Sequence, residues 1–443
     1  MKYKLLLLTF LLFFNDQLDA QQLYYYNDIA PLLLQKCGSC HREGGGAPFE
    51  LLEYRHYAKR KNFIKEVVSS GYMPPWTADS HYRSFANEKI LTPSQKDSII
   101  SWIEQGAKAG KVVAKPALIA MNTEFGLGKP DIELRMPEAY YVPGNNKHHY
   151  ICYKIPYELP GDAYVKAIEF VPGNRALVHH ASYQLFGVSA EVDPKKGPNY
   201  YVFSPDSAAS VDDARDFSYF QLIDSLGNYP FPVFHSGYLP GSGVQEYPAG
   251  IGFAMPRRGV LIIRSLHYSP TPLPATDQSS VRLWLSDTPV ERTLEFAAFK
   301  PRIAGDTIPA DSTRTYYINI RTKGDMSLLH INPHMHQLGK SFKAWALTPT
   351  GDTIPLVYIP HWDFNWQAFY RYKKMLKIPG GSIIHAEAVY DNSTANPSNP
   401  NRPPKPMRIE TGSMDDTTEM MRLVFLYVPY LTGDENISLE TLD

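Results

Sequence analysis

Two of the three cysteines in the chain, Cys37 and Cys40, stand two residues apart, and His41 follows them directly. This spacing suits covalent attachment of haem, because one short loop can form two thioether bonds and present an imidazole to the iron. A redox dithiol should lie near a strand-helix-strand pattern, and a structural zinc site needs a second pair of ligands nearby. Neither accompanies the motif, so we expect one haem c held by these three residues.

A haem iron with His41 on one side needs a ligand on the other, and a thioether there favours the reduced iron. Met73 is the candidate, since Gly71 and Pro74 beside it prevent a regular helix and would keep the loop rigid. His81, further along the same segment, is the competing sixth ligand. The sequence leaves the choice between Met73 and His81 open.

Three stretches around this motif have helical periodicity. They are residues 28–36, residues 53–68 and a segment that starts at Thr92, where Gln95 completes a capping box. We expect them to form a small all-α unit over residues 21–112. With its CGSCH motif, its MPPW loop and its closing helix, this unit resembles a small c-type cytochrome domain.

After the helical part the period of the apolar residues changes. In the stretch TYYINIR, for example, Tyr316, Ile318 and Ile320 occupy alternate positions. Short strands of this kind, bounded by proline, glycine and aspartate, predict antiparallel β-sandwiches. The length of the region suggests two jelly-roll-like domains, over residues 113–287 and 288–443.

Five histidines of this β region could bind metal. His334 and His336 are separated by one residue, so they lie on one face of a strand and can reach the same ion. His179 and His180 are adjacent, and because neighbours on a strand point to opposite faces, a shared ion would require a bulge or a strand end. His267 stands in a third segment. The candidate ligands therefore come from three separate stretches of the chain.

Neutral imidazoles without cysteine thiolates suit copper, zinc or iron. A thioether in one site would favour copper, because reduced copper accepts methionine. Met420 and Met421, at the start of a predicted strand, can supply it, and ordinary core packing is the alternative for both.

Several other residues are interpreted as structural. Cys152 has no partner and is expected to be a small buried hydrophobic residue. The adjacent His148 and His149 are interpreted as a chance pair. His235 and His361 give no readable signal of a function.

In chain order, six motifs resemble those of the copper type II, ascorbate-dependent monooxygenases: VHHASYQLF, RRGVLIIRSLHYSP, INPHMHQLGK, HWDFNWQAFYRY, YDNSTANPSNP and TTEMMRLVFLY. This is the family of peptidylglycine α-hydroxylating monooxygenase and dopamine β-monooxygenase, and the likeness runs from about Pro130 to the C-terminus. The resemblance implies two copper ions. One would be held by His179, His180 and His267, and the other by His334, His336 and Met420.

The resemblance also implies an activity. In this family the first copper stores an electron, while the second activates dioxygen and hydroxylates a C–H bond of the substrate, across an open cleft. The catalytic residues would then be His334, His336 and Met420. The fused haem would deliver the electrons, and its linkage to the same chain would raise its effective concentration to about the millimolar range. The alternatives are a non-catalytic haem and copper electron-transfer protein, or another dioxygen reaction at the same coppers.

The sequence departs from the family at two places. Peptide-hydroxylating members use an arginine two residues before the HxH pair to hold the peptide carboxylate, and this chain has Asn332 there. Bidentate capture of a carboxylate by that residue is lost, which argues against peptidylglycine as the substrate. The stretch before the methionine fits loosely, so Met414 competes with Met420, which we prefer because it enters a strand.

The first residues have the features of a cleaved secretory signal over residues 1–20, and an uncleaved anchor is the alternative, because Leu18 is larger than the usual small residue at a cleavage site. Lys2 and Lys4 precede an apolar run from Leu5 to Phe14 that is too short to span a bilayer. Export and covalent haem together predict a bacterial periplasmic or cell-surface protein without a transmembrane segment in the mature chain. The 44 basic and 45 acidic side chains give no case for nucleic acid. The expected partners are dioxygen, a small-molecule substrate and an external electron donor to the haem.

Overall fold

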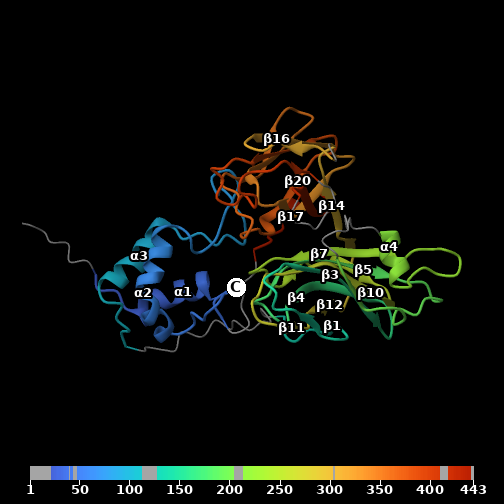
Figure 1. Ribbon diagram of the computed structural model, residues 1–443, viewed down its shortest axis with the longest axis horizontal. Helices are drawn as coiled ribbons and strands as arrows, with labels where there is room; N and C mark the ends of the chain where they lie inside the picture. Colours follow the sequence, from blue (N-terminus) through green and yellow to red (C-terminus); the bar gives the residue numbers. More distant parts are fainter. Residues whose placement is uncertain are drawn as a thin grey trace, which may run out of the picture.

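The computed structural model describes residues 21–38, 40–42, 47–111, 127–203, 213–302, 305–409 and 418–440. The predicted signal peptide, most of the expected linker between the helical and β regions, and Met414 lie outside these residues. The described chain forms a helical unit, blue in Figure 1, and two β units, mainly green and orange. Antiparallel sheets make up most of its regular structure, as predicted.

The helical unit has its helices where the periodicity predicts them. They are η1 (Tyr25–Ile29), α1 (Ala30–Cys37), α2 (Tyr54–Ser69) and α3 (Pro93–Glu104). The predicted capping box of α3 is present, since the Thr92 hydroxyl accepts a bond from the Gln95 amide at 3.2 Å and the Gln95 side chain accepts one from the Thr92 amide at 2.9 Å. The helices enclose a core of their own that includes Leu33, Tyr57 and Trp102.

Residues 75–89, which we call the strap, leave the helical unit and pack against the second β unit. Phe85 forms a β-bridge with Tyr372, and its ring lies 5.1 Å from the ring of Tyr370. Phe85 belongs to the core of the β region rather than to that of the helices. The described residues of the predicted helical segment 21–112 therefore contribute to two separate cores.

The first β unit is built from three sheets. Its elements are β1 (Ile132–Arg135), β2 (Tyr140–Val142), β3 (His149–Glu158), β4 (Ala163–Val171), β5 (Val178–Gly187), β6 (Tyr200–Val202), α4 (Asp213–Tyr219), β7 (Phe231–Tyr238), β8 (Gln245–Glu246), β9 (Ile251–Met255), β10 (Arg258–Tyr268), β11 (Ala275–Asp277), β12 (Ser280–Leu285) and β13 (Arg292–Thr293). One sheet has the order β1-β12-β4-β9-β13, with β8 also paired to β4; the second is β6-β3-β10-β5-β7; β2 and β11 form a small third sheet.

The two larger sheets of this unit pack face to face. Phe170 of β4 contacts Tyr183 of β5 with ring centroids 5.7 Å apart, and Phe234 of β7 stacks on Phe253 of β9 at 4.2 Å. The outer face of the second sheet buries Cys152 in a cluster with α4, so the prediction that Cys152 is a buried hydrophobic residue is confirmed.

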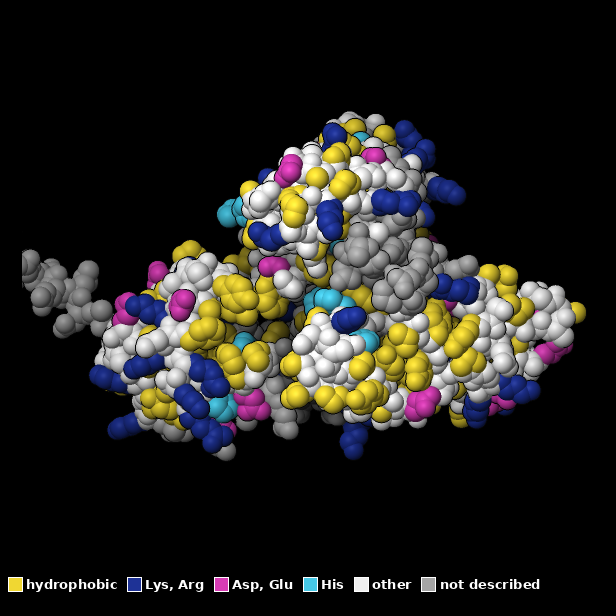
Figure 2. Space-filling model, in the orientation of Figure 1, with side chains coloured by type: hydrophobic (Ala, Val, Ile, Leu, Met, Phe, Trp, Pro, Cys, Tyr) yellow, Lys and Arg dark blue, Asp and Glu magenta, His cyan; other side chains and the backbone are white. Residues whose placement is uncertain are grey.

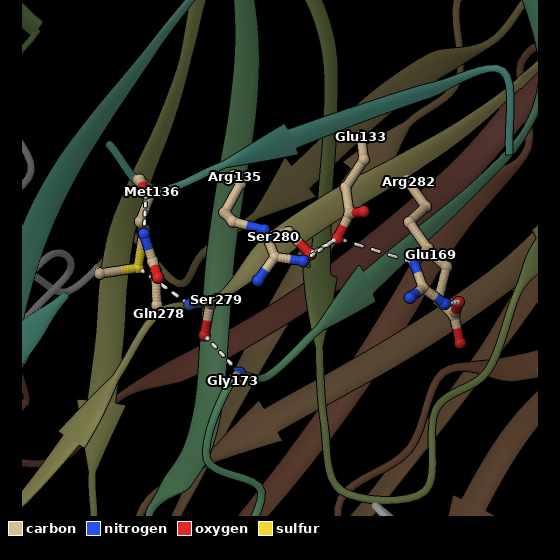
Figure 3. A network of polar contacts seen from close by, with 9 residues as sticks. All are labelled: Glu133, Arg135, Met136, Glu169, Gly173, Gln278, Ser279, Ser280 and Arg282. Atoms are coloured by element: carbon tan, nitrogen blue, oxygen red, sulfur yellow. Dashed lines mark hydrogen bonds and ion pairs between the residues drawn. The ribbon is translucent and has the colours of Figure 1, made fainter. Parts of the chain in front are cut away.

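A polar network fastens the edge of the first sheet (Figure 3). The Ser280 hydroxyl donates to Oε1 of Glu133 at 2.7 Å, and Arg282 lies between Glu133, at 3.9 Å, and Glu169, at 3.8 Å. Burial raises the pKa of Glu169, while the charges of Arg282, Arg175 and Arg42 act to lower it. Because Arg42 belongs to the helical unit, Glu169 lies at the boundary between the two units.

The second β unit follows after Leu294. Its elements are β14 (Glu295–Phe299), β15 (Thr307–Ile308), β16 (Thr313–Arg321), β17 (Met326–Met335), β18 (Gly339–Leu347), β19 (Thr353–Ile359), β20 (Tyr370–Ile378), β21 (Ile383–Asp391), β22 (Met407–Arg408), β23 (Met421–Pro429) and η2 (Asp434–Asn436). The main sheets have the orders β14-β23-β17-β20 and β16-β21-β18-β19, and β15 pairs with β22. Tyr316 and Ile318 of β16 are buried while Tyr317 and Asn319 are exposed, which confirms the predicted alternation.

The two β units are joined through neighbouring short strands. β13 pairs in parallel with β9 of the first unit, and β14 pairs with β23 of the second, so the chain crosses between the units at Leu294. Across the part of the chain that the structure describes, no helix combines the length and the apolar character needed to cross a bilayer.

Candidate metal centres

Strands β5 and β10 bring His179, His180 and His267 together. His180 and His267 are direct partners in the antiparallel pair. Nδ1 of His180 lies 3.2 Å from Nδ1 of His179 and 3.2 Å from Nδ1 of His267. One ring nitrogen of each residue lies within 4.8 Å of those of the other two, so two strands present three nitrogen atoms to one point.

The pairing of β5 with β10 is irregular at this point. The register shifts between Ile263 and His267, and again between His267 and Tyr268. On a regular strand the adjacent His179 and His180 would point to opposite faces. An adjacent histidine pair can share one ion only where the strand is irregular, and the shifts in register at His267 provide this irregularity.

The spacing of this histidine triad fits a metal ion. Nitrogen atoms bound at about 2.0 Å to one ion lie about 2.8–3.5 Å apart for bond angles of about 90–120°, and both measured Nδ1 separations are 3.2 Å. Burial, followed by the neighbouring histidines, lowers the pKa of His179, His180 and His267. All three rings are therefore neutral near pH 7 and keep a lone pair for a metal.

His148 also belongs to this site. Its Nδ1 lies 2.8 Å from Nε2 of His267, on the side of that ring opposite Nδ1, and the Tyr150 ring stacks on His267 at 4.2 Å. A partner at the second nitrogen commonly fixes the orientation of a ligand imidazole. The interpretation of His148 as one half of a chance pair is thus corrected, because it orients a predicted ligand.

β17 and the residue after it carry the second pair, His334 and His336. Nδ1 of His334 lies 2.7 Å from Oε1 of Gln367, and Nδ1 of His336 lies 2.7 Å from the carbonyl oxygen of Thr418. Carbonyl oxygens accept hydrogen bonds and cannot donate them, so each Nδ1 donates its proton and each Nε2 keeps its lone pair. Burial, followed by the charge of His336, lowers the pKa of His334 to about 3. Both residues can therefore bind a metal through Nε2.

The two methionines that precede β23 and begin it have different surroundings. Met420 lines the same cavity as His334 and His336. Met421 begins the strand and belongs to the hydrophobic core. Of the two, Met420 is therefore the one placed beside the histidine pair.

The buried carboxylate of Glu419 holds this region together. It accepts hydrogen bonds from the amide of His336 at 3.0 Å and from the amide of Leu338 at 2.6 Å. The Tyr390 hydroxyl donates to the carbonyl oxygen of Met420 at 2.7 Å. Burial raises the pKa of Glu419 to about 8 against the opposing effect of these amides. The segment with Met420 is thus fixed to the end of β17.

Both histidine sets meet at one cavity between the β units, with a volume of about 190 Å³. His180 lines it from the first unit, while His334, His336 and Met420 line it from the second. His334 and His336 also contribute to the lowered pKa of His180, so the two sets lie close together. Figure 2 shows histidine side chains, in cyan, where the parts of the molecule meet. Of the histidine triad, His180 is the residue that lines this cavity together with His334, His336 and Met420.

The loop between β19 and β20, residues 360–369, touches both histidine sets. The ring of Phe364 lies 5.8 Å from the ring of His179 and 5.9 Å from that of His336. Nε1 of Trp362 donates to the carbonyl oxygen of His336 at 3.1 Å. This loop therefore places apolar side chains between the two candidate sites.

The residues of the haem motif lie at the end of α1. The amides of Cys40 and His41 point to the carbonyl oxygen of Cys37 at 3.3 and 3.0 Å, which forms a compact turn. Nδ1 of His41 donates to the carbonyl oxygen of Phe49 at 2.9 Å, so its Nε2 is left for a metal. None of the three cysteines is in a disulfide, and Cys37 and Cys40 are both half-buried. The motif fits a covalently attached haem.

The two candidates for the distal ligand have different environments. Met73 follows α2 and is half-buried, and its amide donates to the carbonyl oxygen of Val67 at 3.0 Å. His81 lies on the strap with its side chain 98% exposed, beside the carboxylate of Asp79. The structure therefore buries Met73 in part and leaves His81 in solvent.

The haem motif faces the first β unit. An ideal Cβ built on Gly241 would lie 2.7 Å from Nζ of Lys89 and 3.1 Å from Sγ of Cys40, so the Cys40 sulfur reaches the turn after β7. Burial, then the charge of Arg175, lowers the pKa of Arg42, while Glu169 acts to raise it. Both Arg175 and Glu169 belong to the first β unit, which places the motif directly against it.

A second cavity, of about 220 Å³, lies between the strap, the loop after β7 and the β19–β20 loop. Gly241, which adjoins the Cys40 sulfur, and Lys89, whose Nζ donates to the Gly241 carbonyl oxygen at 3.4 Å, both line it. Trp366, whose ring lies 6.3 Å from that of Tyr72 next to Met73, lines it as well. Gln367 lines both this cavity and the one between the histidine sets.

Sequence reasoning missed several residues of the central cavity. His235, interpreted as structural, lines it, with Nε2 3.0 Å from the Ser182 hydroxyl and its ring 3.9 Å from that of Phe296. His361 is exposed. Gln367 carries no signal in the sequence, because its contact with His334 joins distant segments. Arg422, which also lines the cavity, lies opposite His334 in the β17–β23 pair, a register that the sequence does not reveal.

No protein-family model matches the chain, and no curated protein matches it. Among solved structures, one of infectious bursal disease virus, Gx strain, is similar at 11% identity over 70% of this chain and 75% of that chain, with a TM-score of 0.15. The PBSX exported protein XepA is similar at 8% identity over 58% of this chain and 84% of that chain, with a TM-score of 0.11. Scores this low carry no argument about fold or function.

Proposed function

We propose that the chain is an exported copper-dependent monooxygenase that hydroxylates a C–H bond with dioxygen and receives electrons through its own haem. The observation that carries this proposal is that His180, from a triad that could hold a metal ion, lines one cavity together with His334, His336 and Met420. A metal site that only stabilises the fold does not require a second metal site on the opposite side of a cavity. Two sites that share a cavity can act on one bound molecule.

Each site has donors suited to a different task. His179, His180 and His267 would hold one copper, and three imidazoles suit electron storage. His334, His336 and Met420 would hold the other, where the thioether stabilises reduced copper. Copper ions at these sites would supply single-electron transfer and the activation of dioxygen.

The protein side chains would orient the ligands and exclude water. Gln367 and the Thr418 carbonyl fix the protonated nitrogens of His334 and His336, so that each Nε2 faces the metal. Phe296, Phe364 and Phe369 line the cavity and limit the access of water to the reacting atoms. The substrate is a small molecule, since the cavity of about 190 Å³ does not admit a folded chain.

The haem would be the immediate electron donor. Cys37 and Cys40 would attach it, His41 would bind the iron, and Met73 is the proposed distal ligand because the side chain of His81 is 98% exposed. The Cys40 sulfur adjoins the second cavity, and Gln367 separates that cavity from His334. An external reductant would then recharge the haem.

We also propose that the β units are the two jelly-roll-like sandwiches of the copper type II monooxygenases and that the helical unit is a c-type cytochrome domain. The face-to-face sheets and the order of the ligand motifs support the first assignment. The separate helical core around the attachment motif supports the second. Export would place the protein in a bacterial periplasm or at the cell surface.

Metal analysis with haem staining tests this proposal, on protein matured by export in a host that attaches haem. We expect about two coppers and one iron per chain. A His334→Ala variant should lose one copper and keep the iron, while Cys40→Ala should lose covalent haem and keep both coppers. Iron without copper in the parent protein would refute the monooxygenase assignment.

Transfer of electrons from the haem requires a second measurement. In an anaerobic stopped-flow experiment, the reduced haem should be reoxidised by oxidised copper within the same molecule, at a rate independent of protein concentration. The His334→Ala variant should alter this reaction. Reduced haem that persists in the presence of both coppers would show that the haem is not the donor.

A further inference from the structure

Helix α2 of the helical unit carries a local excess of positive charge. Its 16 residues include five basic side chains and a single acidic one, Glu66, whereas the whole chain is balanced at 44 basic and 45 acidic side chains. Figure 2 shows Lys and Arg side chains, in dark blue, gathered on the helical unit at the left of the view. The five basic residues of the helix are Arg55, Lys59, Arg60, Lys61 and Lys65.

Acidic residues outside the helix neutralise two of these charges. Nε of Arg55 lies 2.8 Å from Oε2 of Glu53, and Nζ of Lys65 lies 2.7 Å from Oε1 of Glu104. Lys59 is exposed, and within the part of the chain that the structure describes it forms no ion pair. The middle of the helix therefore presents positive charge to solvent.

A series of aromatic rings links this part of α2 to His41. Phe63 follows Lys59 by four residues, which puts both on one face of the helix, and Phe63 is 51% exposed. The ring of Phe63 lies 6.3 Å from that of Phe49, and the ring of Phe49 lies 4.8 Å from that of His41. The guanidinium of Arg60 lies 4.4 Å from the centre of the Phe49 ring. An exposed aromatic side chain beside positive charges is thus connected by ring contacts to the candidate iron ligand.

An attached haem would leave this surface uncovered. Nδ1 of His41 donates to the carbonyl oxygen of Phe49 at 2.9 Å, so the iron would be bound through Nε2, on the other side of the imidazole. The Cys40 sulfur, to which the haem would be joined, adjoins Gly241 of the first β unit. The haem edge at Cys40 would therefore face the β units, while Phe49 lies behind the iron ligand. Electrons that enter behind His41 need not pass the surface by which they leave.

We propose that Lys59, Arg60 and Phe63 form the docking surface for an acidic redox protein that reduces the haem. Positive side chains attract a negatively charged partner and speed the encounter, and an exposed aromatic ring among them supplies apolar contact. The partner would lose one electron from its reduced cofactor and the ferric haem would gain it, with no bond formed or broken. The inference rests on the proposed function for the covalent haem alone and does not require the coppers.

The rate of haem reduction in the full-length, haem-loaded protein tests the proposal. One probe is reduced flavodoxin, an acidic protein that donates single electrons from a flavin, and the other is the neutral semiquinone of lumiflavin, a free flavin without a protein. The variants are Lys59→Glu and Phe63→Ala. Their controls are Lys323→Glu and Tyr317→Ala, at exposed positions of the second β unit. Circular dichroism verifies that each variant is folded.

At low ionic strength, Lys59→Glu should slow reduction by flavodoxin about tenfold, because it replaces an attraction by a repulsion. Phe63→Ala should slow it as well, and the two control variants should match the parent. Added salt should bring the rates of the parent and Lys59→Glu together, since it screens exposed charges. Reduction by lumiflavin should be the same in all of them. Equal rates with flavodoxin, a parent haem that flavodoxin does not reduce, or equal slowing with lumiflavin would overturn the proposal.

A basic helix face can also bind an anionic membrane, and sedimentation with vesicles of phosphatidylglycerol separates this alternative. The parent should stay in solution. Sedimentation that Lys59→Glu abolishes, together with unchanged flavodoxin kinetics, would overturn the proposal in favour of a membrane surface.

Metal analysis and haem staining of the same preparations separate this inference from the proposed function. Haem without copper, with a rate that depends on Lys59, would refute the monooxygenase and leave the docking surface standing. Two coppers and a haem, with equal rates in the parent and both variants, would refute the docking surface alone. A protein without covalent haem would refute both.

Discussion

Oε1 of Gln367 accepts a hydrogen bond from Nδ1 of His334 at 2.7 Å. The other end of the same amide, Nε2, donates to the carbonyl oxygen of Phe364 at 3.0 Å, which fixes the orientation of the side chain. Gln367 also lines both cavities. One amide therefore sets the proton position on a candidate ligand and forms part of the wall between that ligand and the haem side of the molecule.

Replacement of Gln367 by leucine should weaken copper binding at the His334 site. The change keeps most of the side-chain volume but leaves Nδ1 of His334 without an acceptor, so the ring is free to reorient. Loss of such a partner typically costs about ten- to a hundredfold in metal affinity. Titration with copper in competition with a chromophoric chelator measures this effect. Gln367→Glu, which keeps an acceptor oxygen, is the matched control, and equal affinities of the parent and the leucine variant would contradict the role.

His148 offers a similar test at the histidine triad. Its Nδ1 lies 2.8 Å from Nε2 of His267, and His148→Phe would keep a flat ring while it removes this contact. We expect copper at the triad to bind about tenfold more weakly, with the His334 site unchanged. The adjacent His149→Phe is the control, because Nε2 of His149 contacts Asn145 rather than a triad residue. If both variants bind copper alike, His148 has no part in the site.

Much of the fold and of the candidate metal sites could be predicted from the sequence, because the signals for them lie in short, local stretches. A one-residue separation on a strand places His334 and His336 on the same face wherever the strand lies. The helix that starts at Thr92 is encoded by its own cap. Even the irregular pairing at His180 could be anticipated, since an adjacent pair cannot otherwise reach one ion.

What the sequence could not reveal depends on contacts between distant segments. Gln367 meets His334 only after β20 has paired with β17. Phe85 of the strap contacts Tyr370 and Tyr372, nearly three hundred positions away, so the sequence near Phe85 gives no sign of this packing. Arg422 of β23 lies opposite His334 of β17 only through the register of this strand pair, and strand register cannot be read from one strand alone.

The two β units are fastened beside the crossing at Leu294 by an ion pair. Nη1 and Nη2 of Arg292 each lie 2.7 Å from an oxygen of Asp434, and the Ser327 hydroxyl donates to the same carboxylate at 2.6 Å. Burial of this carboxylate acts to raise its pKa, but the bonds from Arg292, the Leu431 amide and Ser327 outweigh it and lower the pKa to about 2. Arg292 belongs to β13, which pairs with β9 of the first unit, so its ion pair with Asp434 joins the two β units.

This ion pair should make stability depend on pH in acid. An aspartate in an unfolded chain has a pKa of about 3.9, so a folded value near 2 stabilises the protein above about pH 4, and this stabilisation is lost as the pH falls through about 2. Its size is on the order of 2 kcal/mol. Asp434→Asn should therefore be less stable than the parent at pH 7, and the difference should shrink on acidification.

Urea unfolding of the metal-free protein at a series of pH values measures this difference. Other carboxylates titrate in the same range, so the informative quantity is the gap between the parent and the variant rather than either curve. Asp287→Asn, at an exposed position, is the control, and its free energy of unfolding should change with pH in parallel with that of the parent. A constant gap between parent and Asp434→Asn from pH 7 to pH 2 would contradict the assignment.

The strap provides the last prediction, because it holds the helical unit against the second β unit. The buried ring of Phe85 contacts Trp76, Tyr370 and Tyr372 with centroids 5.1–6.2 Å away. Phe85→Ala should weaken the packing of the strap against the second β unit by about 3–5 kcal/mol of free energy. Since the helices have a core of their own, their circular dichroism should persist while the strap detaches.

Limited trypsin digestion detects such detachment, because the strap contains Arg83 and Lys89. In the parent, the guanidinium of Arg83 donates to the carbonyl oxygen of Pro355 at 2.7 and 2.9 Å, which protects the backbone from cleavage. Phe85→Ala should be cut at these two positions many times faster than the parent, whereas Tyr317→Ala, at an exposed aromatic position, should not. Equal cleavage rates would mean that the strap is held by its backbone bonds alone. In that case the haem motif would keep its place against the first β unit without the aromatic cluster.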